Sequence, residues 1–203
     1  MEFLIENEKG QAISIQSIEV SEQKLVKQYI KHTDCVLELG ARYGLISCLI
    51  NQMLDVKTNQ VSVEPDERVW DALEKNKLYN QCDFWIVKGT ISSCPMSLKN
   101  LQGANGYATQ SYPDSASSIP FFSLQEIREK TGIERFSVLF VDCEGCMEQF
   151  LSENESLLNE VRLVLFEKDN PRACNYDKIR NLLTSHAFVE IHCGFHNVWS
   201  KDQ

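Results

Sequence analysis

Acidic side chains follow several apolar segments of this sequence, at the points where those segments end. Glu64 ends the segment QVSVE, Asp142 ends RFSVLFVD, and Glu167 ends RLVLFE. Carboxylates at such positions can accept hydrogen bonds from sugar hydroxyls, take a proton from a reacting group or bind a divalent cation. Because the carboxyl ends of parallel strands meet at one edge of a sheet, we expect these acids to line a common cleft.

A glycine turn separates two apolar runs in the segment DCVLELGARYGLISCLI, residues 34–50. Gly40 and Gly44 follow a run typical of a buried strand and precede a run with helical spacing. A dinucleotide-binding turn needs a further glycine at the position that Arg42 occupies. S-adenosylmethionine has no phosphate and requires only a tight turn beside its amino-acid end, so the spacing favours this cofactor over NAD.

Glu64 follows the glycine turn at the distance expected of a ribose-binding acid, about 20 residues further along the chain. A carboxylate at this strand tip can accept hydrogen bonds from both ribose hydroxyls. Pro65 then stops the strand, so that the acid projects outward. The alternative for Glu64 is an ordinary solvated acid at a strand end.

Apolar runs of strand length alternate with amphipathic helical segments along most of the chain. The expected strands cover residues 35–39, 60–64, 83–89, 135–142 and 162–169, and the expected helices cover residues 45–54, 68–80, 123–133, 146–161 and 175–188. This alternation predicts an α/β fold in which helices cover both faces of a mostly parallel sheet. Residues 189–195 and 196–201 are two more strands with almost no connection, which predicts an antiparallel C-terminal hairpin.

The whole chain, residues 1–203, is predicted to form a single domain. Residues 1–33 form a lead-in, with a short strand over residues 13–20 and a helix capped by Ser21. Residues 92–120 are rich in Gly, Ala, Ser and Pro and predict a long loop, either a lid over a site or a tolerated surface insertion.

The net charge of −9, from 29 acidic and 20 basic residues, repels phosphate backbones and anionic lipid. We therefore expect no nucleic-acid partner and no membrane partner. No secretion signal and no apolar run of bilayer length is visible, so the predicted location is cytoplasmic. The eight cysteines are scattered through apolar segments, and we interpret them, including both in CEGC (residues 143–146), as reduced buried thiols.

Four segments, LELGARYG, VEPDERVWDALEKN, VKG and VDCEG, occur in the order and spacing of FkbM-type S-adenosylmethionine-dependent methyltransferases, which the sequence resembles over residues 34–190. The resemblance implies a Rossmann-like class I methyltransferase fold, whose seven-stranded sheet has an antiparallel last strand. It also implies O-methylation of a hydroxyl, often on a sugar or a secondary metabolite. The expected cofactor-binding residues are Glu38, Gly40, Ala41, Gly44, Glu64, Pro65, Lys88, Gly89, Thr90 and Asp142.

Methylation of a hydroxyl calls for a general base, and Asp142 is expected in the cleft beside two candidates. Glu144 lies at the mouth of the cleft, and His196 lies in the terminal hairpin and titrates near neutrality. A packing or turn histidine is the alternative role for His196. Asp142, Glu167 and Asp169 would be hard oxygen ligands for Mg²⁺, with solvated strand-end acids as the alternative.

The sequence therefore predicts an S-adenosylmethionine-dependent O-methyltransferase that acts on a hydroxyl-bearing small molecule or glycan. One alternative is a methyltransferase whose acceptor is a non-carbohydrate small molecule. Another is a catalytically inactive module that retains the cofactor pocket and serves a larger assembly. An NAD-dependent oxidoreductase is the least favoured hypothesis, because the close-approach glycine is missing.

Overall fold

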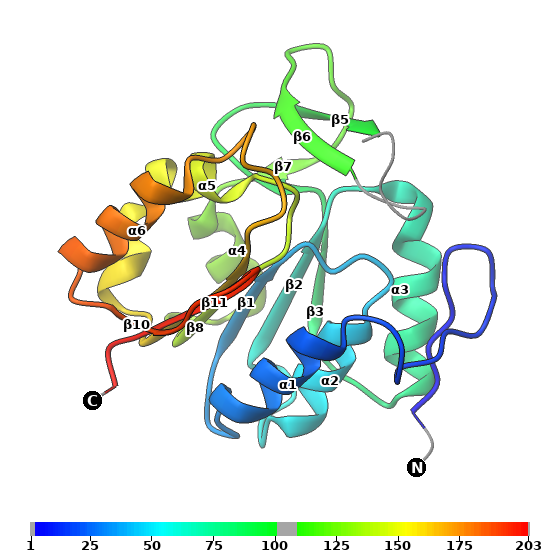
Figure 1. Cartoon of the computed structure of the whole chain (residues 1–203). Coiled ribbons are helices and arrows are strands. Elements are labelled where there is room, and N and C mark those ends of the chain that lie inside the picture. The colour runs from blue at the N-terminus through cyan, green and yellow to red at the C-terminus, as the bar shows by residue number, and fades with distance from the viewer. Residues whose placement is uncertain (1–2, 101–108, 203) are drawn as a thin grey trace.

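The apolar runs predicted as strands form one continuous sheet (Figure 1) in a computed structural model that describes residues 3–100 and 109–202. Its members within these residues are β1 (Val36–Leu39), β2 (Gln60–Glu64), β3 (Trp85–Lys88), β8 (Val138–Val141), β9 (Leu163–Glu167), β10 (Val189–His192) and β11 (His196–Ser200). These seven strands lie in the order β10-β11-β9-β8-β1-β2-β3. β11 runs antiparallel to both neighbours, whereas β3, β2, β1, β8 and β9 are parallel. The predicted α/β fold, a mostly parallel seven-stranded sheet with an antiparallel C-terminal pair, is confirmed.

The strand order reverses beside β1. The chain builds outward from β1 through β2 to β3, and then returns to place β8 on the other side of β1. At such a switch point the connections after β1 and β8 leave in opposite directions, which opens a crevice beyond the carboxyl ends of these strands. The glycine turn after β1 and Asp142 after β8 both lie at this place.

Helices cover both faces of the sheet, because each has an apolar stripe that must be buried. One face carries α1 (Val20–Tyr29), α2 (Leu45–Met53) and α3 (Glu67–Tyr79), and the other carries α4 (Leu124–Thr131), α5 (Met147–Glu153), the 3₁₀ helix η1 (Glu155–Asn159) and α6 (Tyr176–Ser185). Side chains such as Asp66 for α3 and Asn175 for α6 cap the helix starts. No helix in the described part of the chain is long and apolar enough to cross a membrane.

The segment predicted as a long loop over residues 92–120 contains one pair of strands and is flanked by another pair. β4 (Thr90–Ile91) pairs in parallel with β7 (Phe121–Phe122), and β5 (Met96–Asn100) pairs antiparallel with β6 (Thr109–Pro113). The β5–β6 pair lies above the carboxyl ends of the central strands (Figure 1). Residues 101–108 of the expected loop lie outside the described residues. The loop prediction was wrong for β5 and β6, because cross-strand pairing stabilises segments that are poor in intrinsic strand formers.

The lead-in also differs from the prediction, since residues 13–20 form no strand. Ile13, Ile15 and Ile18 instead pack as partly buried side chains against the core beneath α1 and α2. Their apolar alternation therefore reflects packing of an irregular segment. α1 begins after Glu19, which has a left-handed backbone (φ 52°), so Ser21 lies inside the helix rather than capping it.

Gly40 follows β1 where the chain passes closest to the end of β8. Its backbone has φ +93°, and a Cβ atom built on it would lie 1.6 Å from the carbonyl oxygen of Asp142. The Asp142 N–H donates to the Leu39 carbonyl at 2.9 Å, which holds the two strand ends together. Any side chain at residue 40 would have to separate β1 from β8.

We expect Gly40→Ala to lower the free energy of unfolding by about 2–4 kcal/mol, because it combines a left-handed backbone with a backbone clash. The matched control is Gly132→Ala, where φ is +72° and nothing lies within 4 Å of the added Cβ. The control should lose only about 1–2 kcal/mol. Urea denaturation of both variants measures the difference, and equal losses would contradict this account of Gly40.

Candidate functional site

Charged side chains form a row across the carboxyl edge of the sheet, on the face covered by α1 to α3. Strand register places Glu64 opposite Lys88 and Glu167 opposite His196. Gly40 and Asp142 come directly after the paired residues Leu39 and Val141, so they occupy the middle of the same row. From β3 to β11 the row contains Lys88, Glu64, Gly40, Asp142, Glu167 and His196. The prediction that strand-end acids meet at one edge is met by Glu64, Asp142 and Glu167.

A cavity of about 910 Å³, open to solvent, lies beyond the middle of this row. Its walls include six of the predicted site residues: Gly40, Glu64, Pro65, Thr90, Asp142 and Glu144. The remaining predicted residues do not line it: Glu38, Ala41, Gly44, Lys88, Gly89, Glu167, Asp169 and His196. The cavity thus joins the glycine turn and the tip of β2 to the acids that follow β8.

Glu64 holds the glycine turn to the end of β2. One carboxylate oxygen accepts the Arg42 N–H at 2.6 Å, and the other accepts the Asp66 N–H at 2.8 Å. Burial raises the pKa of Glu64 to about 7, although these two backbone donors oppose the rise. Each carboxylate oxygen has a second lone pair, so Glu64 can still accept hydrogen bonds from a molecule in the cavity.

Glu38, predicted to meet the cofactor, is buried beneath the cavity instead. The Ser62 hydroxyl donates to one of its carboxylate oxygens at 2.5 Å, and the Gln60 side-chain amide lies 3.3 Å from the same oxygen. The other oxygen has no hydrogen-bond partner within the described residues. Burial raises the pKa of Glu38 to about 7, against the lowering effect of the neighbouring hydroxyl and amide groups. Glu38 therefore lies under the glycine turn, out of contact with the cavity.

Other predicted cofactor residues support the site from outside its walls. Gly44 caps α2 with φ +86°, and a Cβ there would lie 2.5 Å from Leu73 of α3. Lys88 turns away from the cavity and pairs with Glu74 at 2.7 Å. Gly89 lies against the Pro120 carbonyl, 2.2 Å from where a Cβ would be. These residues shape the turns around the cavity rather than its surface.

Residues from β5 and β6 complete the cavity, and none of them is among the residues predicted from the sequence. Met96 and Leu98 of β5 and Thr109 and Ser111 of β6 line it, at every second position of each strand. This period-two alternation was the available signal, because alternate residues of a strand face the same side. The high Gly, Ser and Pro content of residues 92–120 obscured it.

The cysteines of CEGC form a disulfide, so the prediction of reduced thiols was wrong for this pair. Cys143 and Cys146 are bonded with their Cα atoms 5.5 Å apart, and both line the cavity. Glu144 and Gly145 between them have left-handed backbones (φ 53° and 97°), which curl the chain enough for the two sulfurs to meet. The other cysteines of the described chain are free thiols. The bridge thus frames the loop that presents Glu144.

Asp142, Glu167 and Asp169 form a cluster in which one ligand oxygen of each lies within 4.8 Å of the others. Burial and the neighbouring Asp142 charge raise the pKa of Glu167 well above its ordinary value. The pKa of Asp142 is raised less, because its hydrogen bond with Glu167 opposes the effect of burial. Burial thus raises the pKa of both acids, and that of Glu167 more strongly.

Glu144 faces the cavity from the disulfide-framed loop and is half-buried. Burial and the charges of Asp169 and Asp142 raise its pKa to about 7. A carboxylate that titrates near neutrality suits general-base chemistry at that pH. His196, the other predicted base, lies beyond Glu167 in the row and does not reach the cavity.

Solved methyltransferases share this architecture at low sequence identity. An O-methyltransferase from Bacillus cereus in complex with SAH aligns with a TM-score of 0.56 at 11% identity, covering 93% of this chain and 84% of that chain. An rRNA methylase from Streptococcus thermophilus aligns at 0.55 and 6% identity, covering 94% and 100%. A ribosomal protein L11 methylase from Lactobacillus delbrueckii subsp. bulgaricus aligns at 0.50 and 12% identity, covering 89% and 76%. The likeness establishes a class I methyltransferase fold, which hosts different acceptors.

Comparison by sequence adds no closer relative. No family model matches the chain, and no curated protein matches it.

We expect Glu38→Gln to make the protein more stable at pH 8 than the wild type. Glutamate in the unfolded chain titrates near 4.5 and Glu38 in the folded chain near 7, so the folded protein binds more protons between these values. The stabilising effect of the protonated acid is therefore present below the lower value and is lost as the pH rises through 7. Glutamine resembles the protonated acid and does not titrate.

Urea denaturation at pH 5 and pH 8 measures this effect. The stability gained by the variant relative to the wild type should be greater at pH 8 by on the order of 1–3 kcal/mol. The same difference at both pH values would show that Glu38 titrates normally.

Proposed function

We infer that the protein transfers a methyl group from S-adenosylmethionine to a hydroxyl oxygen. The observation that carries this inference is the continuous cavity that joins the Gly40 turn and Glu64 at one side to Asp142 and Glu144 at the other. One side has the groups that suit a nucleoside and its amino-acid tail, and the other has titratable acids that suit an acceptor. The shared fold with an SAH-bound O-methyltransferase supports the inference.

The cofactor half of the proposal rests on the groups around Gly40. Glu64 offers carboxylate oxygens that would accept hydrogen bonds from ribose hydroxyls. Gly40 and Arg42 of the glycine turn line the part of the cavity where the methionine portion would lie. Pro65, Thr90 and Ile91 border the same side of the cavity and would contact adenine. The acids around the cavity also favour a cationic sulfonium over the neutral thioether that remains after transfer.

The reaction moves one methyl group and one proton. The acceptor oxygen attacks the methyl carbon while the carbon–sulfur bond breaks, and the electron pair of that bond stays on sulfur. The acceptor hydroxyl gives up its proton to a base, which we assign to Glu144 because its carboxyl faces the cavity. A positioned base contributes roughly 10²–10⁴-fold to such a step, and alignment of the two reactants adds to it.

The acceptor proposed here is a hydroxyl-bearing small molecule or glycan. Ser92, Thr109, Ser111 and Gln149 offer hydrogen-bonding groups around the cavity, while Met96 and Leu98 offer apolar surface. This mixture suits a polyhydroxylated ring, which has polar edges and less polar faces. The net charge of −9 disfavours RNA as acceptor, and the resemblance to the FkbM type favours a sugar.

A hard divalent cation such as Mg²⁺ fits the oxygen cluster formed by Asp142, Glu167 and Asp169. The donor set consists of oxygen only, and one oxygen of Asp169 is buried without a hydrogen-bond partner among the described residues. A bound cation would supply charge that orients an acceptor oxygen. Without a cation, a proton shared by Asp142 and Glu167 would reduce the negative charge of the cluster. The assignment of Glu144 as base is the same with a cation or with a shared proton.

Glu64→Ala is expected to weaken S-adenosylmethionine binding at least tenfold, because it removes the proposed ribose acceptor and frees the Arg42 N–H. Isothermal titration calorimetry measures the affinity, and the melting temperature without ligand reports any loss of folding. The control is Glu67→Ala, which removes an exposed acid from the start of α3. Unchanged affinity in Glu64→Ala would count against the proposed cofactor site.

Glu144→Gln is expected to lower kcat at least 100-fold with little change in cofactor affinity, since glutamine cannot accept the proton. In the wild type, kcat/KM should rise with pH through an apparent pKa of about 7, because the base must be ionised. Mass detection of methyl gain on a panel of sugars and small alcohols provides the assay.

The exposed Glu129 of α4 supplies a matched control as Glu129→Gln. Normal turnover in Glu144→Gln would exclude this residue as the base. Cofactor binding without methyl transfer to any acceptor would favour the catalytically inactive module.

A further inference from the structure

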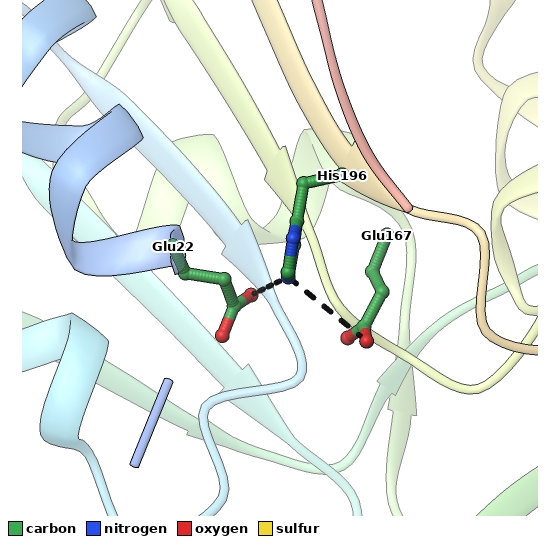
Figure 2. A group of neighbouring side chains, drawn as sticks. All are labelled: Glu22, Glu167 and His196. Carbon is green, nitrogen blue, oxygen red and sulfur yellow. Dashed lines mark ion pairs between the residues drawn. The ribbon is translucent and has the colours of Figure 1, made fainter. Parts of the chain in front are cut away.

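Three side chains from distant parts of the chain converge beside the candidate site. Glu22 comes from the first turn of α1, Glu167 ends β9, and His196 begins β11. The His196 Nε2 atom lies 3.9 Å from an oxygen of Glu22 and 4.0 Å from an oxygen of Glu167. Figure 2 shows the two carboxylates on opposite sides of the imidazole, both directed towards this nitrogen. The three ligand atoms all lie within 4.8 Å of one another.

Glu22 is the member of this group that most requires an explanation. Its side chain is 4% exposed, and within the described residues it takes part in no hydrogen bond. A carboxylate at this position of a helix commonly accepts a free backbone N–H of the first turn, but Glu22 points into the molecule instead. Burial and the neighbouring acids raise the pKa of Glu22, and a cation bound beside it would favour its ionised form.

The distances from His196 to the two acids are longer than those of a hydrogen-bonded ion pair. A charged imidazole that bonded either carboxylate would do so at roughly 2.7–2.9 Å. Here the nitrogen is almost equally far from both acids, which leaves a gap between the three groups. Ligand atoms around a tetrahedral ion with bonds of about 2.0–2.1 Å lie roughly 3.3 Å apart, so small side-chain rotations would close the site.

We propose that Glu22, Glu167 and His196 bind a divalent transition-metal ion of the zinc type. One imidazole nitrogen and two carboxylate oxygens suit Zn²⁺ or Co²⁺ better than Mg²⁺, which prefers oxygen ligands alone. Three protein ligands leave a coordination position for water or another oxygen. A small pocket lined in part by Glu22, His196 and Asn197 adjoins the three side chains and has space for about one water molecule.

This site differs from the oxygen cluster on the other side of Glu167. It requires Glu22 and His196, whereas the oxygen cluster requires Asp142 and Asp169. An ion bound by Glu22, Glu167 and His196 would join α1 to the end of the sheet. Because these ligands come from three elements, only the folded protein would bind the ion. Metal binding should therefore raise the melting temperature. The inference does not depend on methyl transfer.

The test is titration of the metal-free full chain with Co²⁺, whose visible absorption reports nitrogen and oxygen ligation. The wild type should bind one equivalent of Co²⁺ and give a visible absorption typical of Co²⁺ with a low coordination number. Added Zn²⁺ should displace the Co²⁺, whereas excess Mg²⁺ should not. Glu22→Gln and His196→Asn should each weaken binding at least roughly tenfold and abolish the rise in melting temperature. Binding should persist in Asp169→Asn and in His192→Asn, which changes an exposed histidine of the same hairpin.

Two results would overturn the proposal. One is a wild-type protein that binds neither Co²⁺ nor Zn²⁺. The other is binding that survives both Glu22→Gln and His196→Asn but is lost in Asp169→Asn, which would place the ion in the oxygen cluster. If Glu22→Gln fails to fold, His196→Asn decides the outcome, because His196 is at the more exposed edge of the group.

Discussion

The contact between the backbones of Gly40 and Asp142 determines how the whole carboxyl edge is arranged. β1 and β8 can end side by side only because no Cβ stands between them, and the turns that follow then separate towards α2 and α5. The glycine is needed here for close approach as much as for its backbone angle. The cavity exists because the segment after β1 and the segment after β8 leave this contact in different directions. Glu64 holds the segment after β1 in place by accepting the Arg42 N–H.

The second organising feature is the concentration of acids at this edge. Glu38, Glu64, Asp142, Glu144 and Glu167 all have pKa values raised mainly by burial. Such groups lower stability when they ionise, so their presence is a cost that the apolar core must offset. These acids lower stability but are suited to chemistry, because a set of acids with shifted pKa values can bind cations and exchange protons near neutral pH.

The fold could be predicted from the sequence because its signals are local and repeated. Each apolar run and each amphipathic run specifies an element, and a parallel sheet follows from their alternation. Glu64, Asp142 and Gly40 could be placed near one another by the same logic, since parallel strands bring their ends together. Glu38 could not be placed so well, because its position two residues before the turn does not reveal that Ser62 and Gln60 enclose it.

Other parts of the site depend on contacts between distant segments. Glu22 looks like an ordinary acid in a helix, and only the docking of α1 beside β11 turns it towards His196. The β5–β6 pair depends on partners that flank residues 101–108, and its short strands have few β-branched residues. The spacing of Cys143 and Cys146 fits both two free thiols and a disulfide. The left-handed backbones of Glu144 and Gly145 bring the two sulfurs together, and the sequence does not reveal these backbone angles.

The disulfide closes a loop of only four residues, so it removes little disorder from the unfolded chain and adds little to global stability. Its effect is confined to the short segment that carries Glu144. Opening the bridge would loosen that segment while the sheet stays folded, and the carboxylate facing the cavity would lose its fixed position. The redox potential of the surroundings would then control the position of a carboxylate in the cavity wall.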